Sequence, residues 1–387
     1  MTEKLYYLDS HLYDFTAVIT DILSFGDRKA VVLNRTAFFP EGGGQPGDEG
    51  YVGSMKITDT QEQNGEVLHF VDGDISFSRG DEVNCSVNAG LRFSRMQAHS
   101  GEHILSGVAH KIYGAENVGF HMADLVMTVD FDKPLSKEQL AGIEKEANEW
   151  VYKNVPVTAE FVSPEKLNTL QYRSKLDLKE NVRIVTIEGC DMCACCAPHV
   201  ARTGEIGIIK ILTAVSHRGG VRITVVCGAK AYGDYCRKHA DIMVLSDMLK
   251  APNDAVPAAL EELSEKLTEE KRNSNLYRQR LYDYIARGLE KTADCLLVFV
   301  DDFSPDELRE LAEKCKTKSD KLFAVFSGDD EHGYAFAVSS QNVKLRSLSA
   351  KLNGELNARG GGRDEMLQGK AGVPAEKIKK FFSEIEV

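Results

Sequence analysis

Two pairs of potential metal ligands stand out in this sequence of 387 residues. His99 and His103 are four positions apart in a segment with helical periodicity, so both imidazoles lie on one face of a helix. Cys195 and His199 repeat this spacing much later in the chain. Two such pairs of nitrogen and sulfur donors suit Zn²⁺, which prefers tetrahedral sites of this kind. The pattern predicts one zinc ion per chain, held by these four side chains.

Three further cysteines lie beside the second pair. Cys190 and Cys193 form a C-x-x-C motif, but no second motif of this type partners it. We therefore interpret Cys190, Cys193 and Cys196 as auxiliary or buried thiols.

A competing interpretation concerns Glu102, which completes an H-x-x-E-H pattern between His99 and His103. This is the motif of the inverzincin metallopeptidases, in which the glutamate would act as general base on a metal-bound water. A downstream acidic residue would complete that site. Cys195 and His199 would then be idle, which counts against the peptidase alternative.

A glycine-rich segment at residues 36–50 could approach a ligand with its backbone. Its three consecutive glycines allow backbone N–H groups to come close to a bound molecule: Gly42, Gly43 and Gly44. Gln45 and Thr36 add side-chain hydrogen-bonding groups, which favours a substrate loop. The segment lacks the Gly-Lys-Ser/Thr ending of a P-loop and is no Rossmann motif. A tight turn between strands, without a ligand, is the structural alternative.

Several folded parts must position these groups, and the hydrophobic pattern predicts an α+β multidomain chain. Residues 1–90 alternate short apolar runs with Gly/Asp turns and predict a small N-terminal β-barrel. Residues 91–235 mix both periods and predict an α+β zinc-binding domain. Residues 236–291 predict a helical linker and candidate coiled coil. Residues 292–387 alternate strands and helices and predict a small C-terminal α/β domain.

Three helices can be delimited further. Helical spacing of apolar residues predicts one helix over Gln97–Tyr113. Ser136 begins a second in capping-box style, and this helix runs to about Lys153. The third is a long amphipathic helix from Ala258 to Lys291, either paired as a coiled coil or packed on its own domain.

Composition limits the class of protein. The chain is 43% hydrophobic and 27% charged, which is typical of globular proteins. No apolar run could span a membrane and no export signal is evident. A net charge of −12 argues against nonspecific coating of nucleic acid, although residues 341–387 carry nine Lys/Arg against six Asp/Glu. Four of the nine cysteines cluster at 190–196, so we expect reduced thiols and a cytoplasmic location.

Four segments in this order resemble a known family. They are Phe38–Gly50, His99–His103, Cys195–Gly207 and Arg359–Ala371. Together they are similar to the editing domain of alanyl-tRNA synthetase, its free-standing AlaX relatives and the DHH-associated domain that follows in the synthetase. The resemblance covers nearly the whole chain, in the arrangement of the long AlaX form.

The resemblance implies a trans-editing hydrolase for misacylated tRNA(Ala). Its substrate would be Ser-tRNA(Ala), with Gly-tRNA(Ala) as a second candidate, and Ala-tRNA(Ala) would be spared. A site that hydrogen-bonds the serine hydroxyl can discriminate in this way, and Thr36 is our candidate for reading that hydroxyl. Glu102 and Gln45 are candidates for orienting water. Four protein ligands would favour an anchoring zinc and three ligands a catalytic one, and both alternatives remain.

The resemblance also assigns partners. The tRNA-binding candidates lie in the C-terminal glycine-rich segment: Arg359, Gly360, Gly361, Gly362, Arg363 and Gln368. The helical region and this module are expected to form a homodimer. We expect no ATP binding, no tRNA charging and no membrane partner.

One departure from the family pattern concerns the second ligand pair. The family commonly has Cys-Gly-Gly-Thr-His where this chain has Cys195-Cys-Ala-Pro-His199. The ligand positions are kept, but Pro198 stiffens the segment and a threonine hydroxyl is lost. Any role of the Gly-Gly-Thr segment in the family therefore does not carry over to this chain. Separately, a noncatalytic, zinc-stabilised tRNA-binding protein would show the same motifs and is an alternative beside the peptidase.

Overall fold

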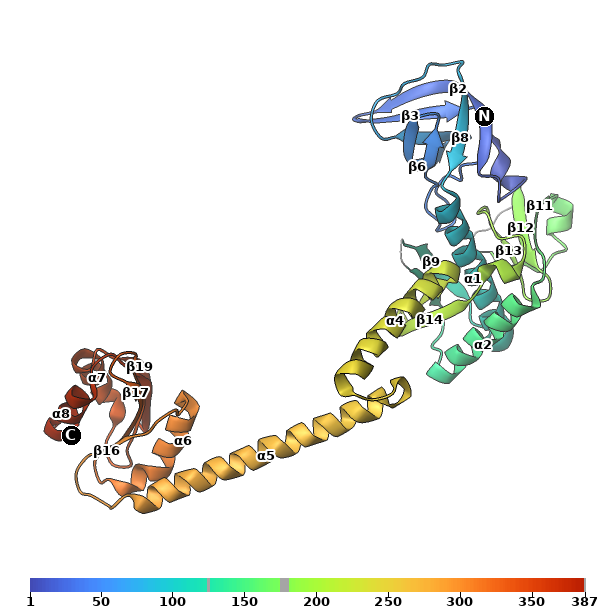
Figure 1. Ribbon diagram of the computed structural model, residues 1–387. Helices are drawn as coiled ribbons and strands as arrows, with labels where there is room; N and C mark the ends of the chain where they lie inside the picture. Colours follow the sequence, from blue (N-terminus) through green and yellow to red (C-terminus); the bar gives the residue numbers. More distant parts are fainter. Residues whose placement is uncertain (124–125, 175–180, 386–387) are drawn as a thin grey trace. The chain divides into compact units, whose positions relative to one another are not determined.

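The computed structural model describes residues 1–123, 126–174 and 181–385 and divides into two compact units, Met1–Leu245 and Ser246–Val387 (Figure 1). Both units combine helices with sheets, so the predicted α+β multidomain organisation is confirmed. The finer boundaries at residues 90, 235 and 291 stay predictions. Within the described ranges, no helix is both long enough and apolar enough to cross a membrane.

The first unit begins with a closed barrel of six strands in the order β2-β3-β7-β6-β5-β8. These are β2 (Asp14–Phe25), β3 (Arg28–Leu33), β5 (Gly50–Val52), β6 (Met55–Gln63), β7 (Glu66–Val71) and β8 (Glu82–Val87). Alternation explains the interior: β8 buries Val83, Cys85 and Val87 and exposes the residues between them. Two short strands, β1 (Glu3–Lys4) and β4 (Arg35–Thr36), pair in parallel. The 3₁₀ helix η1 (Leu5–Tyr7) follows β1.

Helix α1 (Ala89–Tyr113) carries the predicted histidine pair. The Asn88 side chain caps its start by accepting from Leu91 N, and Gly114 ends it in the left-handed conformation. The helix begins earlier than the predicted Gln97. All residues from 96 to 109 are buried, so α1 is a central helix covered on every side.

A four-stranded antiparallel sheet and helix α2 pack around α1. The sheet has the order β14-β15-β10-β9. Its strands are β9 (Asn117–Met122), β10 (Met127–Phe131), β14 (Ile209–His217) and β15 (Gly220–Cys227). Helix α2 (Lys137–Lys153) begins with the predicted capping box, in which Ser136 and Gln139 bond each other's backbone N–H. Its apolar residues join those of α1 and the sheet in the largest core of the unit.

A second antiparallel sheet, β11-β12-β13, completes the first unit. Its elements are β11 (Val157–Val162), β12 (Val182–Ile187) and β13 (Asp191–Ala194), with the short helix α3 (Pro164–Leu167) after β11 and the 3₁₀ helix η2 (Thr203–Ile206) beyond β13. Phe161 pairs with Arg183, and Val185 pairs with Cys193. The register therefore fixes which side chains share a face.

Two helices follow. Helix α4 (Gly228–Leu249) begins after β15, and α5 (Val256–Gly288) spans 33 residues after the 3₁₀ helix η3 (Asn253–Ala255). The long helix predicted over Ala258–Lys291 is thus present. Leu260, Leu263 and Leu267 are about half exposed on it. The coiled-coil pairing stays a prediction.

The C-terminal unit contains a five-stranded sheet in the order β16-β17-β18-β20-β19. Its elements are β16 (Leu296–Phe299), α6 (Pro305–Cys315), η4 (Lys316–Lys318), β17 (Phe323–Asp329), β18 (Gly333–Ser339), η5 (Leu345–Leu348), α7 (Ser349–Glu355), β19 (Arg359–Arg363), β20 (Met366–Ala371) and α8 (Ala375–Glu384). Only the β16–β17 pair is parallel among the described strands of this sheet. The predicted strand-helix alternation is present in the β16–α6–β17 crossover, and helix α7 separates β18 from β19 further along, but the strands beyond β17 pair antiparallel.

Candidate metal centre

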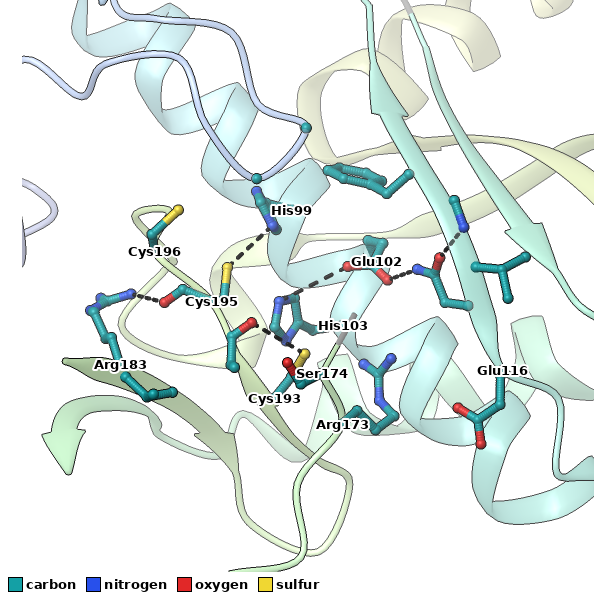
Figure 2. Close-up of a pocket in the computed structure, with 18 of the residues that line it drawn as sticks. His99, Glu102, His103, Glu116, Arg173, Ser174, Arg183, Cys193, Cys195 and Cys196 are labelled. Carbon is teal, nitrogen blue, oxygen red and sulfur yellow. Dashed lines mark hydrogen bonds and ion pairs between the residues drawn. The ribbon is translucent and has the colours of Figure 1, made fainter. Parts of the chain in front are cut away.

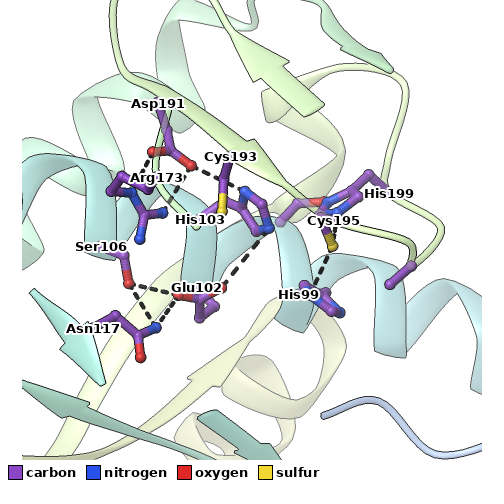
Figure 3. Close-up of polar contacts among 12 residues, drawn as sticks. His99, Glu102, His103, Ser106, Asn117, Arg173, Asp191, Cys193, Cys195 and His199 are labelled. Carbon is purple, nitrogen blue, oxygen red and sulfur yellow. Dashed lines mark hydrogen bonds and ion pairs between the residues drawn. The ribbon is translucent and has the colours of Figure 1, made fainter. Parts of the chain in front are cut away.

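The four predicted ligands lie together inside the first unit. The donor atoms of His99, His103, Cys195 and His199 are all within 4.8 Å of one another (Figure 3). Cys195 Sγ is 3.5 Å from His99 Nε2 and 3.4 Å from His199 Nε2. Zn–S bonds of about 2.3 Å and Zn–N bonds of about 2.0–2.1 Å put neighbouring donors about 3.6 Å apart in a tetrahedron. The residues present therefore fit a tetrahedral metal ion in both chemistry and spacing.

Two elements bring these donors together. The histidine pair projects from one face of α1, and Cys195 and His199 lie in the loop that follows β13. The glycine at position 107 lets the two elements approach closely, because a Cβ there would lie 2.6 Å from the carbonyl oxygen of Cys190. Close packing of α1 against the start of β13 thus aligns the donors from both segments.

Each histidine has its outer nitrogen occupied by another side chain. The Nδ1 partners are Gln45 Oε1 for His99 at 3.1 Å, Asp191 Oδ2 for His103 at 3.0 Å and Ser100 Oγ for His199 at 3.0 Å. Such partners fix the tautomer and the ring orientation of metal-ligating histidines. In each case Nε2 is the nitrogen left for an ion.

Asp191 links the centre to a cation in the pocket wall. Arg173 donates to it through two bonds of 2.7 and 2.9 Å, and His103 bonds one of the same oxygens. Burial raises the pKa of Asp191, but His103 and Arg173 outweigh it and hold that pKa at about 2. Asp191 is therefore an ionised partner for His103.

The protonation states of two donors suit metal binding. Burial lowers the pKa of His199 to about 3, so this imidazole is neutral. Burial opposes ionisation of Cys195, but the neighbouring histidines dominate and the pKa of this thiol falls well below its usual value. Neutral imidazole and thiolate are the forms that ligate metals.

Glu102 is a buried carboxylate beside the centre. Its Oε1 accepts hydrogen bonds from Ser106 Oγ at 2.5 Å and from Asn117 Nδ2, and its Oε2 lies 3.9 Å from His103 Nε2. Burial raises the pKa of Glu102, but the charges of His103 and Arg173 and the Ser106 bond bring it below its ordinary value. One oxygen is therefore held by the protein while the other faces the centre.

A pocket of about 580 Å³ adjoins these groups (Figure 2). Its lining includes three of the four predicted ligands together with Glu102, so the centre faces a space large enough for a small substrate. Other lining side chains are Tyr7, Glu116, Asn117, Phe120, Phe161, Arg173, Arg183, Cys193 and Cys196.

The glycine loop forms a tight turn at the pocket. Gly42 and Gln45 exchange backbone hydrogen bonds of 3.0 Å, and Gly43 and Gly44 between them have φ values of +60° and +82°. This is the pattern of a type I′ turn, which requires positive φ at both central residues. Gly43 and Gly44 line the pocket, whereas Gly42 and Gln45 do not. The segment is therefore a tight turn between strands, and this turn also forms part of the pocket wall. Its role as a substrate loop stays a prediction.

Two predicted site residues act from behind the pocket wall. Gln45 is fully buried and touches His99, so its position suits orienting a ligand rather than a water. Thr36 is also fully buried, and its hydroxyl lies 2.8 Å from His69 Nε2 and accepts from Phe38 N at 3.0 Å. The structure does not place Thr36 in the pocket lining, because its hydroxyl is committed inside the barrel. A role in reading a substrate hydroxyl does not follow from this position.

The six predicted tRNA-binding residues lie on the β19–β20 hairpin of the second unit. All five residues of Arg359–Arg363 are exposed, and Gly361 pairs with the exposed Gln368. Glycine is needed at Gly360 and Gly362, where a Cβ would lie 2.4 and 2.0 Å from carbonyl oxygens of β20. The hairpin therefore presents a smooth backbone surface with an arginine at each end of β19.

Three regions of the chain match models of known protein families. Residues 10–91 match the model of class II (A) tRNA synthetases, 182–224 that of the threonyl and alanyl tRNA synthetase second additional domain, and 293–386 the DHHA1 domain. The alanyl-tRNA editing protein AlaX-L of Pyrococcus horikoshii is 27% identical over 98% of this chain and 96% of its own length. The chain therefore resembles the long-form AlaX editing proteins over nearly its whole length. Its three matched regions occur in the same order as the barrel, the metal centre and the C-terminal sheet.

Other proteins similar to this chain are longer. The alanine–tRNA ligases of Korarchaeum cryptofilum and Methanococcus maripaludis are 30% and 28% identical over 98% and 99% of the chain, which spans only 44% and 43% of their length. The solved C-Ala domain of Aquifex aeolicus alanyl-tRNA synthetase aligns with 24% of the chain and 95% of that domain, at 19% identity and a TM-score of 0.21.

The site contains residues that the sequence pattern did not reveal. Asp191, Arg173 and Ser100 support the ligands, and Asn117 supports Glu102. Alternation could have revealed Asp191, because it lies two positions before Cys193 in β13 and shares its face. Cys193 forms a second potential metal-binding group with His103 and Asp191. Cys196 Sγ lies over the glycine loop, 3.5 Å from where a Cβ of Gly43 would be.

Proposed function

We propose that this protein is a zinc-dependent deacylase that hydrolyses the ester of misacylated tRNA(Ala). The observation that carries the proposal is Glu102, a buried, ionised carboxylate with one oxygen facing the nitrogen and sulfur donors at the wall of the pocket. A chain-long match to a protein named for alanyl-tRNA editing supplies the substrate class. tRNA(Ala) as partner therefore rests on this similarity.

The reaction needs a base for water and a fixed ester. Glu102 Oε2 accepts a proton from the attacking water, while Ser106 and Asn117 keep the other oxygen in place. The new C–O bond forms to the carbonyl carbon, the bond to the ribose oxygen breaks, and that oxygen takes the proton. A bound Zn²⁺ would supply Lewis-acid polarisation or anchoring of the substrate. His99, His103, Cys195 and His199 would hold it.

Selectivity for serine needs a polar group that meets its hydroxyl. Polar side chains line the pocket, and a site that hydrogen-bonds a hydroxyl can reject an analogue lacking it by about 10⁴-fold or more. We therefore propose serine as the preferred substrate, whereas Gly-tRNA(Ala), which also lacks the hydroxyl, would be hydrolysed far more slowly. Ala-tRNA(Ala) would be spared because it leaves such a group unpaired.

Contacts with tRNA and formation of a homodimer are also part of this proposal. The β19–β20 hairpin would contact tRNA through Arg359, Arg363 and Gln368, and the chain would act as a homodimer. The peptidase alternative is disfavoured, since it leaves Cys195 and His199 without a role although both join the donor cluster.

The test combines activity with metal content. Ser-tRNA(Ala), Gly-tRNA(Ala) and Ala-tRNA(Ala) are incubated with the full chain, and zinc is measured on the same sample. We expect fast loss of serine, spared alanine and one zinc per chain. Glu102→Gln should lower kcat by about 10²–10⁴-fold with zinc retained, whereas Glu149→Gln, at an exposed position of α2, should change neither. A zinc-loaded protein that hydrolyses none of these esters would leave the noncatalytic alternative.

A further inference from the structure

An exposed aromatic side chain stands at the pocket. Phe161 lies on the edge strand β11, is 55% exposed and lines the pocket. The half-buried ring of Tyr7 also lines the pocket and meets Phe161 edge to face, with centroids 5.1 Å apart and planes at 84°. Tyr7 thus supports the ring of Phe161 from one side, while much of the Phe161 side chain faces solvent.

The sheet register connects this aromatic pair to the metal centre. Phe161 pairs with Arg183 on β12, and Cys195 N donates to Arg183 O at 3.0 Å on the other side of that strand. Phe161, Arg183 and Cys195 therefore form one row across neighbouring strands. Two strand spacings separate Phe161 from the ligand segment, about 10 Å. This span is comparable to that of an aminoacylated nucleoside.

Arg183 joins both ends of this row. Its guanidinium donates to the carbonyl oxygen of Cys195 at 3.1 Å (Figure 2). It also donates to the carbonyl oxygen of Ala197 at 2.9 Å and lies 5.3 Å from the centre of the Tyr7 ring. In the described part of the chain, no carboxylate lies within ion-pair distance of Arg183, which is buried. One buried cation therefore ties the aromatic pair to the ligand loop.

We propose that Phe161, supported by Tyr7, is the surface on which the base of the terminal nucleotide stacks while its ester lies at the metal centre. This inference deepens the proposed function and rests on it. The acyl group of serine is small, so most of the contact area of the substrate belongs to the nucleotide. Single-stranded bases stack on exposed aromatic rings, and binding of this remote part can position the reacting ester.

Two synthetic esters isolate the contribution of the nucleotide base, adenine. The full-length, zinc-loaded protein is given 3′-O-seryl adenosine and the matching seryl ester of methyl riboside, which has the same sugar and ester without a base. We expect wild type to prefer the adenosine ester. Phe161→Ala should lower kcat/KM for that ester about 5- to 150-fold and leave the riboside unchanged.

Three further variants separate stacking from other effects. Phe161→Tyr keeps a ring and should keep the preference, whereas Phe161→Leu keeps apolar bulk and should lose it. Phe25→Ala removes another exposed ring, on β2 of the barrel, and should change neither ester. Equal wild-type rates for both esters, or a preference that survives Phe161→Ala, would overturn the stacking surface while leaving the deacylase intact.

A binding measurement tests the stacking surface even if the protein hydrolyses no ester. If wild type hydrolyses no ester, equilibrium dialysis compares the trinucleotide CCA with the same strand carrying an abasic 3′ end. Tighter binding of CCA that Phe161→Ala abolishes would support the stacking surface without any hydrolysis. Equal binding of the two strands would overturn it.

Discussion

At the scale of single residues, the centre depends on hydrogen bonds one layer behind the donors. Asp191→Asn keeps the shape of the side chain but removes the charge that His103 and Arg173 share. We expect zinc affinity to fall about 10- to 100-fold, measured by competition with a chelator of known affinity. Asp59→Asn, which breaks an ion pair with Arg28 on the barrel, should leave the zinc affinity unchanged. Equal affinities in both variants would contradict a positioning role for Asp191.

Two cysteines compete for the role of thiolate ligand. Cys195 belongs to the group of four donors, and Cys193 to the alternative group with His103 and Asp191. We expect Cys195→Ala to abolish stoichiometric zinc and Cys193→Ala to retain it. Cobalt substitution provides the measurement, because a sulfur-to-cobalt charge-transfer band should persist only where the ligand cysteine remains. Loss of the band in Cys193→Ala alone would assign the sulfur ligand to Cys193.

At the scale of elements, the glycine turn is shaped by steric limits. Gly44 and Gly26 both have positive φ, but a Cβ at Gly44 would lie 2.6 Å from the Phe120 ring, while one at Gly26 meets open space. Gly26→Ala should therefore cost about 1–2 kcal/mol of unfolding free energy without loss of hydrolysis. Gly44→Ala should also displace Phe120 in the pocket wall and lower kcat/KM at least about tenfold. Unfolding in urea and initial rates measure the two effects, and equal activity of both variants would contradict the clash.

The barrel contains a buried histidine that should make its stability depend on pH. Burial lowers the pKa of His69 to about 4, against about 6.5 in the unfolded chain. Between these values the unfolded state binds a proton that the folded state does not, so stability is complete above about pH 6.5 and falls as pH drops towards 4. The loss should reach about 3 kcal/mol. Unfolding of wild type and His69→Gln across this range measures it, and identical slopes would contradict the assignment.

The elements differ in how far the sequence could predict them. Helix α2 and the long α5 were predictable because capping residues and apolar spacing are local signals. The early start of α1 was not, because Arg92 is fully buried there by pairing with Asp48, a contact between distant segments. The clustering of the two donor pairs was predictable from their spacing. The bond between the Thr36 hydroxyl and His69 was not, because His69 lies on another strand.

At the scale of the whole molecule, the chain combines a net charge of −12 with an exposed hairpin bearing arginine at both ends of β19. If Arg359 and Arg363 contact phosphates, replacing both by alanine should reduce the slope of log K against log salt for tRNA(Ala) by about 1.5–2. Hydrolysis of seryl adenosine should not change, since that substrate lacks the tRNA phosphates that the two arginines would contact. Replacing Arg309 and Lys316 of the same unit provides the matched control. An unchanged slope would remove the hairpin from the tRNA interface.

The position of the donors has a consequence for folding. His99 and Cys195 are 96 positions apart in the chain. An ion held by both therefore acts as a reversible cross-link that closes a large loop. A covalent link of this size would stabilise the folded state by about 4–5 kcal/mol through the entropy of the unfolded chain. Chelation should lower the melting temperature and speed amide exchange in α1 and the 195–199 loop together, so zinc supply would set the lifetime of this protein as well as its chemistry.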